Sequence, residues 1–167
     1  MISVRAFLQI ALGLWVTIWP LAAIAQSPQV AFGTTQQDSS LPVEVTADNL
    51  NVNQNDNTAL FTGNVLIGQG EMRMSAPRVL VVYNADRSGI RSLNATGGVT
   101  LVSGEDAAEA VQADYNIETG LIEMSGDVLL VQGPSALTAD KMFVDTRAGT
   151  ARMTGRVKTV LQPEGQN

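Results

Sequence analysis

Three aspartates that each follow an alanine are the residues of this chain that could most readily suggest catalysis or metal binding. They are Asp48, Asp114 and Asp140. Hydrolysis of a glycosidic bond needs two carboxyl groups at a defined distance across a cleft, and calcium needs more oxygen ligands than one aspartate per segment supplies. We therefore expect these aspartates to stabilise turns or bulges by hydrogen bonds to backbone N–H groups, and we expect no metal site.

The composition argues against most other reaction chemistry. The chain contains neither histidine nor cysteine, which removes Ser-His and Cys-His pairs, thiol nucleophiles and imidazole metal ligands. A net charge of −6 argues against a nucleic-acid partner, because such a partner favours a basic surface. We expect a protein that is not an enzyme and uses no cofactor.

The first 25 residues have the pattern of a secretory signal peptide. Arg5 precedes an apolar run, Pro20 follows it, and Ala23-Ile24-Ala25 forms a cleavage signature, so we expect cleavage before Gln26. An uncleaved membrane anchor is the alternative. Residues 26–40 are rich in Gln, Ser and Thr without periodicity, and we expect a disordered leader there.

From residue 41 onward the sequence predicts β-strands. Apolar and polar residues alternate, and turn clusters such as "NQNDN", "NADRSG" and "DTRAG" separate the alternating runs, which is typical of antiparallel hairpins. We expect one all-β domain over residues 41–162 and a C-terminal tail at 163–167. Eight or more strands favour a jelly roll folded over on itself, and a β-solenoid is the competing architecture.

A repeated motif lies in the middle of four of these strands. Ser or Thr is followed by a glycine, one further residue and valine, and the glycines are Gly63, Gly97, Gly126 and Gly155. An alanine-led pair precedes each glycine, namely Ala47-Asp48, Ala76-Pro77, Ala113-Asp114 and Ala139-Asp140. Counting in twos places every glycine on the apolar side of its strand. Such a glycine either lets a long strand bulge and bend or leaves a hollow in the apolar face.

The apolar side of the strands is the candidate binding surface. Its members are Val45, Phe61, Val65, Ile67, Met72, Met74, Leu93, Val99, Leu101, Ile122, Met124, Val128, Leu130 and Met153. The same pattern also predicts a plain hydrophobic core. The methionines lean slightly toward a binding surface, because flexible thioethers repack around variable ligands.

Residues 41–162 resemble the OstA-like domain of the LptA family of lipopolysaccharide export proteins. The resemblance lies in "LPVEVTADNLNVNQNDNTALFTGNVLIGQGEMRMSAPRVLVV" and is best at Phe61–Val65 followed by Gln69-Gly70, whereas the second half is more divergent. It implies a twisted, V-shaped antiparallel β-jelly roll that binds the lipid A part of lipopolysaccharide in its apolar interior. It also implies a periplasmic location, head-to-tail self-association, and LptC-like and LptD-like partners in the inner and outer membranes.

The resemblance also makes the strand edges and the basic residues candidates for binding. Unpaired edges near Pro42–Ala47 and Arg156–Leu161 would dock other proteins, although frayed termini are the alternative. The docking candidates are Val43, Val45, Val157 and Val160. Lipid A phosphates would suit basic side chains, most of which we expect to be ordinary solvated charges. The basic candidates are Arg73, Arg78, Lys141, Arg152, Arg156 and Lys158.

Three other functions remain open on the sequence. The chain could be an envelope scaffold or adaptor domain that holds no lipid, or an LptC-like anchored component if the signal is not cleaved. An enzyme acting on envelope glycans is the weakest alternative, because no paired-carboxylate motif is present.

Overall fold

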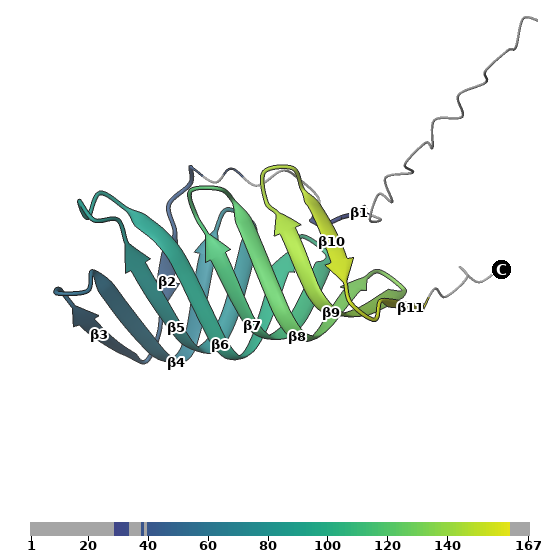
Figure 1. The fold of residues 1–167 in the computed structure, drawn as a ribbon, viewed down its shortest axis with the longest axis horizontal. Coiled ribbons are helices and arrows are strands. Elements are labelled where there is room, and N and C mark those ends of the chain that lie inside the picture. Colours follow the sequence, from purple (N-terminus) through teal and green to yellow (C-terminus); the bar gives the residue numbers. More distant parts are fainter. Residues whose placement is uncertain (1–28, 34–37, 39, 161–167) are drawn as a thin grey trace, which may run out of the picture.

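The computed structural model of the chain describes residues 29–33, 38 and 40–160. These residues form eleven antiparallel strands in one sheet (Figure 1). The strands are β1 (Gln29–Ala31), β2 (Glu44–Thr46), β3 (Asn49–Asn53), β4 (Thr58–Gln69), β5 (Met72–Tyr83), β6 (Ile90–Ser103), β7 (Asp106–Asn116), β8 (Leu121–Gln132), β9 (Ser135–Asp145), β10 (Thr150–Thr154) and β11 (Lys158–Val160). Nowhere in this part of the chain is there a helix long and apolar enough to cross a membrane.

Strands that follow one another in the chain pair as hairpins. The order across the sheet is β1-β10-β9-β8-β7-β6-β5-β4-β2, while β3 also pairs with β4 and β11 with β9. Because β2 and β3 pair with different halves of β4, they act as one long strand with an interruption. The same is true of β10 and β11 along β9.

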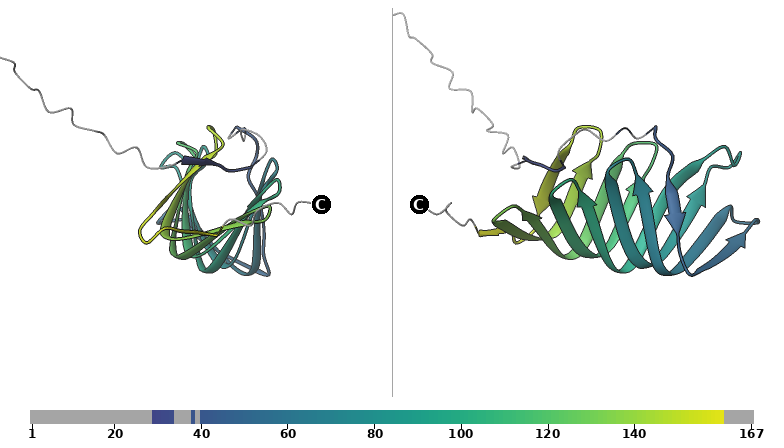
Figure 2. Two further views of the ribbon diagram at one scale, coloured as in Figure 1. Left: turned by 90° about the vertical axis from the view of Figure 1, so that its right-hand side faces the viewer. Right: turned by 180° about the vertical axis from the view of Figure 1, so that it is seen from behind.

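Each long strand bends near its middle, so that the sheet has a V-shaped cross-section when viewed along its long axis (Figure 2). We call the two sides of the V the first and second arms. The first arm ends at the turns after Gln69, Ser103 and Gln132, and the second arm ends at the turns after Tyr83 and Asn116. The prediction of an all-β, twisted and V-shaped antiparallel fold is confirmed.

The bend coincides with a β-bulge in the strands that carry the glycine motif. The register of β4 against β5 shifts between Thr62 and Val65, and the intervening Gly63 and Asn64 have positive φ values of 79° and 45°. Equivalent shifts occur in β6 and β8 at their own motif glycines. A bulge adds one residue to one strand and bends it without ending the ladder. The motif therefore marks the line along which the sheet folds.

The space beside the motif glycines is filled by side chains of the outer face. A Cβ atom on Gly63 would lie 2.5 Å from Oδ2 of Asp48, and one on Gly126 would lie 2.8 Å from Cβ of Val111. Both Asp48 and Val111 are exposed to solvent. The alternative of a hollow in the apolar face is therefore wrong, and glycine is needed for the positive φ and for the contact on the outside.

The same contacts correct our description of the repeat. Gly97 faces Pro77 and Gly155 faces Asp140, as expected, but Gly126 faces Val111. Ala110-Val111 therefore occupies the place that we had assigned to Ala113-Asp114. All four residues that face the motif glycines follow an alanine, but they differ in type. Because Val111 is not an aspartate, the Ala110-Val111 pair is hard to recognise in the sequence.

The N-terminal part of the described chain also departs from expectation. Gln29–Ala31 form β1, which pairs with β10, and Phe32 is only 4% exposed in the core. The prediction of a disordered leader is therefore wrong for residues 29–33. The signal peptide at residues 1–25 and the C-terminal tail at 163–167 lie outside the described residues.

We predict that Gly126→Ala destabilises the protein by about 2–4 kcal/mol, since left-handed strain adds to the clash with the stiff Val111 side chain. The matched control is Gly133→Ala, which also has a positive φ but has no atom within 4 Å of the added Cβ. It should cost only about 1 kcal/mol. Urea unfolding measures both values, and equal losses would contradict the steric part of this explanation.

Candidate functional site

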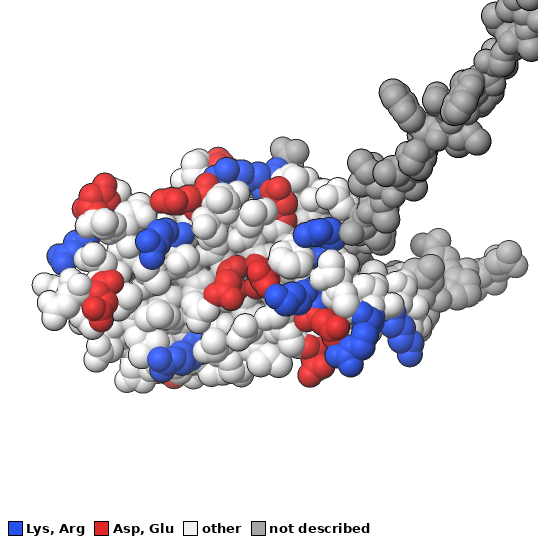
Figure 3. Space-filling view, in the orientation of Figure 1, with Lys and Arg blue, Asp and Glu red and all other residues white. Residues whose placement is uncertain are grey.

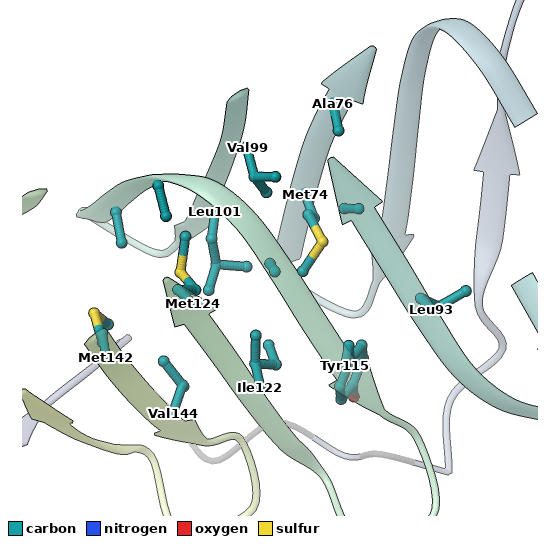
Figure 4. Close-up of a cluster of buried hydrophobic side chains, with 14 of the residues drawn as sticks. Met74, Ala76, Leu93, Val99, Leu101, Tyr115, Ile122, Met124, Met142 and Val144 are labelled. Atoms are coloured by element: carbon teal, nitrogen blue, oxygen red, sulfur yellow. The ribbon is translucent and has the colours of Figure 1, made fainter. Parts of the chain in front are cut away.

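The inner faces of the two arms form one continuous apolar interior. Side chains from β5 to β9 point toward one another across it (Figure 4). All the residues of the predicted binding surface lie in this interior: Val45 and Phe61 are partly buried near its N-terminal end, and the others are buried. The structure thus brings the predicted residues together.

Sequence reasoning missed the inner residues of the returning strands. They include Val79, Val81, Ala113, Tyr115, Met142 and Val144. In β5, buried positions run 72, 74, 76 and then 79 and 81, so the alternation changes phase opposite the bulge. A phase change assumed at each alanine-led pair would have identified these residues from the sequence.

Methionine is concentrated in the interior. The chain has six methionines, and the five after Met1 are all buried there, namely Met72, Met74, Met124, Met142 and Met153. An unbranched thioether chain can change rotamer to fill gaps of different shape. The interior is therefore buried, and some of the side chains that fill it can change conformation.

The apolar inner face is exposed at both ends of the V. At the N-terminal end, Leu50 and Val52 of β3 are 56% and 59% exposed and stand beside Phe61 and Ala59 on the same face. At the C-terminal end is a cavity of about 340 Å³. Its lining is Val30, Gln132, Ser135, Leu137, Met153, Val157 and Thr159.

A polar contact between the arms closes the mouth of the V. The Tyr115 hydroxyl, on the second arm, donates a hydrogen bond of 2.6 Å to Oε1 of Gln69, at the tip of the first arm. Nε2 of Gln69 in turn donates to the Leu41 carbonyl at 3.0 Å. Burial raises the pKa of Tyr115, although the Thr146 hydroxyl and the Arg147 charge oppose this effect. Tyr115 therefore stays a neutral hydrogen-bond donor.

Residues 29–33, which we call the strap, cross the mouth of the V at its C-terminal end (Figure 2). Phe32 N donates to the Gly149 carbonyl of the second arm at 3.0 Å. On the first arm, Asp106 Oδ2 accepts from Gly33 N at 2.8 Å, and Gln132 Nε2 donates to the Ala31 carbonyl at 2.7 Å. The strap therefore connects both arms.

The predicted basic residues are all exposed and do not gather at one site. Arg73 donates to the backbone carbonyls of the adjacent turn, Lys141 pairs with Glu123, and Arg152 stacks over the Phe143 ring at 4.9 Å. Figure 3 shows acidic and basic side chains interspersed on one face of the molecule. These contacts therefore do not single out any of the six basic residues as a phosphate ligand.

Two of the three aspartates lie at bulges, as expected, but their side chains bond to other side chains. Asp48 accepts from Asn64 Nδ2 at 2.8 Å, and Asp140 accepts from Arg156 Nε at 2.9 Å. The Arg156 hydrogen bond lowers the pKa of Asp140. Asp114 instead pairs with Asn94 away from the bulge. In the described part of the chain, no group of three or more Asp or Glu residues could hold a metal ion.

The predicted docking edges lie at opposite ends of the sheet. Val43 and Val45 lie near the edge strand β2, while Val157 and Val160 are exposed beside or within β11. The strap adds an edge that we did not predict, because β1 covers β10. The docking role of these residues stays a prediction.

A second hollow, of about 1380 Å³, lies along the second arm. It is lined by outward-facing polar residues such as Ser92, Asp114, Glu123 and Arg152 as well as by Leu121 and Phe143. Its polar lining distinguishes it from the apolar interior, although the interior residues Tyr115, Ile122, Val144 and Ala151 also border it.

Comparison with known proteins gives a consistent result. Residues 44–150 match the family model described as "LptA/(LptD N-terminal domain) LPS transport protein". An uncharacterized protein of Rhizobium meliloti (strain 1021) is 27% identical over 92% of this chain and 89% of its own. The lipopolysaccharide export system protein LptA of Escherichia coli (strain K12) is 25% identical over 80% of this chain and 77% of its own.

A solved structure has the same fold. The crystal structure of LptH, the LptA-homologous periplasmic component of the lipopolysaccharide transport device of Pseudomonas aeruginosa, superposes with a TM-score of 0.68. The match covers 76% of this chain and 99% of that chain, at 16% identity. At such low identity the likeness establishes the fold alone.

We predict that Tyr115→Phe lowers the free energy of unfolding by about 1–2 kcal/mol at neutral pH, because a buried hydrogen bond between the arms is lost. Chemical denaturation measures this difference. In the wild type, stability should also fall as the pH rises above 10.0, the ordinary tyrosine pKa, because ionisation favours the unfolded chain. The variant should lose less stability in that range, and parallel pH profiles would contradict this role of Tyr115.

Proposed function

The chain belongs to the LptA/LptD N-terminal domain family of lipopolysaccharide transport proteins, and on that premise we propose that it carries lipopolysaccharide across the periplasm as a bridge component. In this proposal the lipid A acyl chains lie between the two arms while the sugars face water. The protein performs no chemistry on the lipid.

The observation that carries the proposal is the uninterrupted apolar interior, which runs the length of the V and is exposed at both ends. Each CH₂ group of an acyl chain costs about 0.8 kcal/mol to expose to water, so a carrier needs a long apolar surface. The buried methionines support the proposal, because they can move to make room for acyl chains of different length.

The proposed location is the periplasm, after cleavage before Gln26. Support comes from the signal-like pattern of residues 1–25 and from the family. If the mature N-terminus were found to retain this segment, the LptC-like anchored role would replace the bridge role.

We further propose that copies stack head to tail. The sheet ends in β2 and β3 on one side and in β1 and β11 on the other, and unpaired strand edges can receive strands of another chain. Because the two edges differ, such contacts make an open row rather than a closed dimer. LptC-like and LptD-like partners would take the two ends of the row.

We predict that a photoreactive residue at Phe61 or Met124 crosslinks to lipopolysaccharide in cells, because both positions face the interior. The matched controls are Leu60 and Ser125, which are one residue away and face outward, and they should give much weaker lipid crosslinks. Immunoblotting for lipopolysaccharide detects the products. Crosslinks to protein alone at the interior positions would favour the adaptor function.

We predict that Val157→Asp combined with Val160→Asp abolishes a concentration-dependent increase in size, because two charges would be placed at the C-terminal docking end. Light scattering measures the size. The control Leu121→Asp places a charge at an exposed apolar residue on the outer face of β8 and should leave the association unchanged. Equal effects of the two variants would argue against docking at this end.

A further inference from the structure

We propose that the strap, residues 29–33, is a displaceable cover over the interior, and that an acyl chain entering the C-terminal part of the V takes the place of Phe32. This inference rests on the proposed function, since the guest is the acyl chain of a lipid. It concerns a segment of this chain that the expected site did not include.

The first argument is the position of the Phe32 side chain. Phe32 is 4% exposed and belongs to the same buried cluster as the inner residues of the arms. Its neighbour Val30 packs against that cluster and lines the 340 Å³ cavity at the C-terminal opening. The strap therefore fills space that is continuous with the proposed acyl-chain site, and a guest that extends to this end must compete with it.

The second argument is how the strap is held. β1 has three residues, and β10 is its partner in the sheet. Beyond this pairing, the strap forms hydrogen bonds with Gly149, Asp106 and Gln132. A short terminal segment with few bonds opens at a lower free energy than the central strands of a sheet.

The third argument is topological. β1 stands at the end of the strand order, so its departure leaves every other strand pair intact. By contrast, the Tyr115–Gln69 contact joins residues of β7 and β4, which are held by neighbours on both sides. Of the two closures of the mouth, the strap is the one that can open without disturbing the sheet.

Hydrogen–deuterium exchange on the unmodified full chain tests the opening. The amides of residues 29–33 should exchange at least about tenfold faster than those of β7. Purified lipopolysaccharide should speed exchange in the strap and slow it in β6–β8. Asp106→Ala and Gln132→Ala should each speed strap exchange further, because each removes a hydrogen bond that holds the strap.

A disulfide lock tests the consequence for binding. Ala31 and Thr150 are register partners on β1 and β10, and the chain has no cysteine of its own. Oxidised Ala31→Cys/Thr150→Cys protein should bind purified lipopolysaccharide at least about tenfold more weakly than the same protein after reduction. The matched control is Asn51→Cys/Leu60→Cys, which joins partners on β3 and β4 and should bind equally well in both states.

The outcomes separate this inference from the function on which it rests. Strap amides as slow as those of β7, slower exchange of the strap with lipopolysaccharide, or equal binding by the oxidised and reduced lock would overturn the strap proposal even where the protein binds the lipid. Absence of binding by the wild type would overturn the proposed function. In that case, fast hydrogen exchange in the strap would still show that the strap opens, but an acyl chain would be excluded as the ligand that displaces Phe32.

Discussion

The structure depends on bending long strands without breaking the hydrogen-bond ladder between them. An unpaired backbone group in the interior is costly, so a sheet of this width cannot fold over through simple interruptions of its central strands. The glycine motif solves this problem with one bulge per hairpin, at which Gly63 and Asn64 adopt left-handed angles and the neighbouring strand changes phase. Because the bulges align across the sheet, the two arms face each other and enclose one interior.

That interior is a hydrophobic core, and in the proposed function it is also the binding site. Its side chains are buried, as stability requires, yet five of them are methionines, and its ends expose Leu50, Val52 and Val157. The mouth of the V is closed by two kinds of contact. One is the hydrogen bond between the neutral Tyr115 and Gln69, which lie on inner strands of the sheet. The other is the strap, which pairs with β10 at the end of the strand order. A carrier of acyl chains needs such a combination, because it must be stable when empty and able to open when loaded.

The outer surface plays a different part. Some of its charged residues pair locally, as Lys141 does with Glu123 and Arg156 with Asp140. The ends of the sheet are the surfaces at which we propose that other chains dock. In the proposed function, transport depends on the shape of an apolar passage and on strand edges.

The sequence by itself determined the class of fold, the position of the bends and one half of the inner face. Alternation with period two identifies Phe61, Val65 and Met124 as residues of one face, since neighbouring side chains on a strand point to opposite sides. Only the tertiary structure decided which way the motif glycines face, that Val111 takes the place expected for Asp114, and that Phe32 lies in the core. The physical reason is that a bulge changes the phase of the alternation on one strand relative to its partner, so the count of twos fails where the sheet bends. The strap does alternate, with Val30 and Phe32 turned toward the core and Ala31 exposed, but an alternation over five residues is too short to identify a strand that is held by contacts with distant turns.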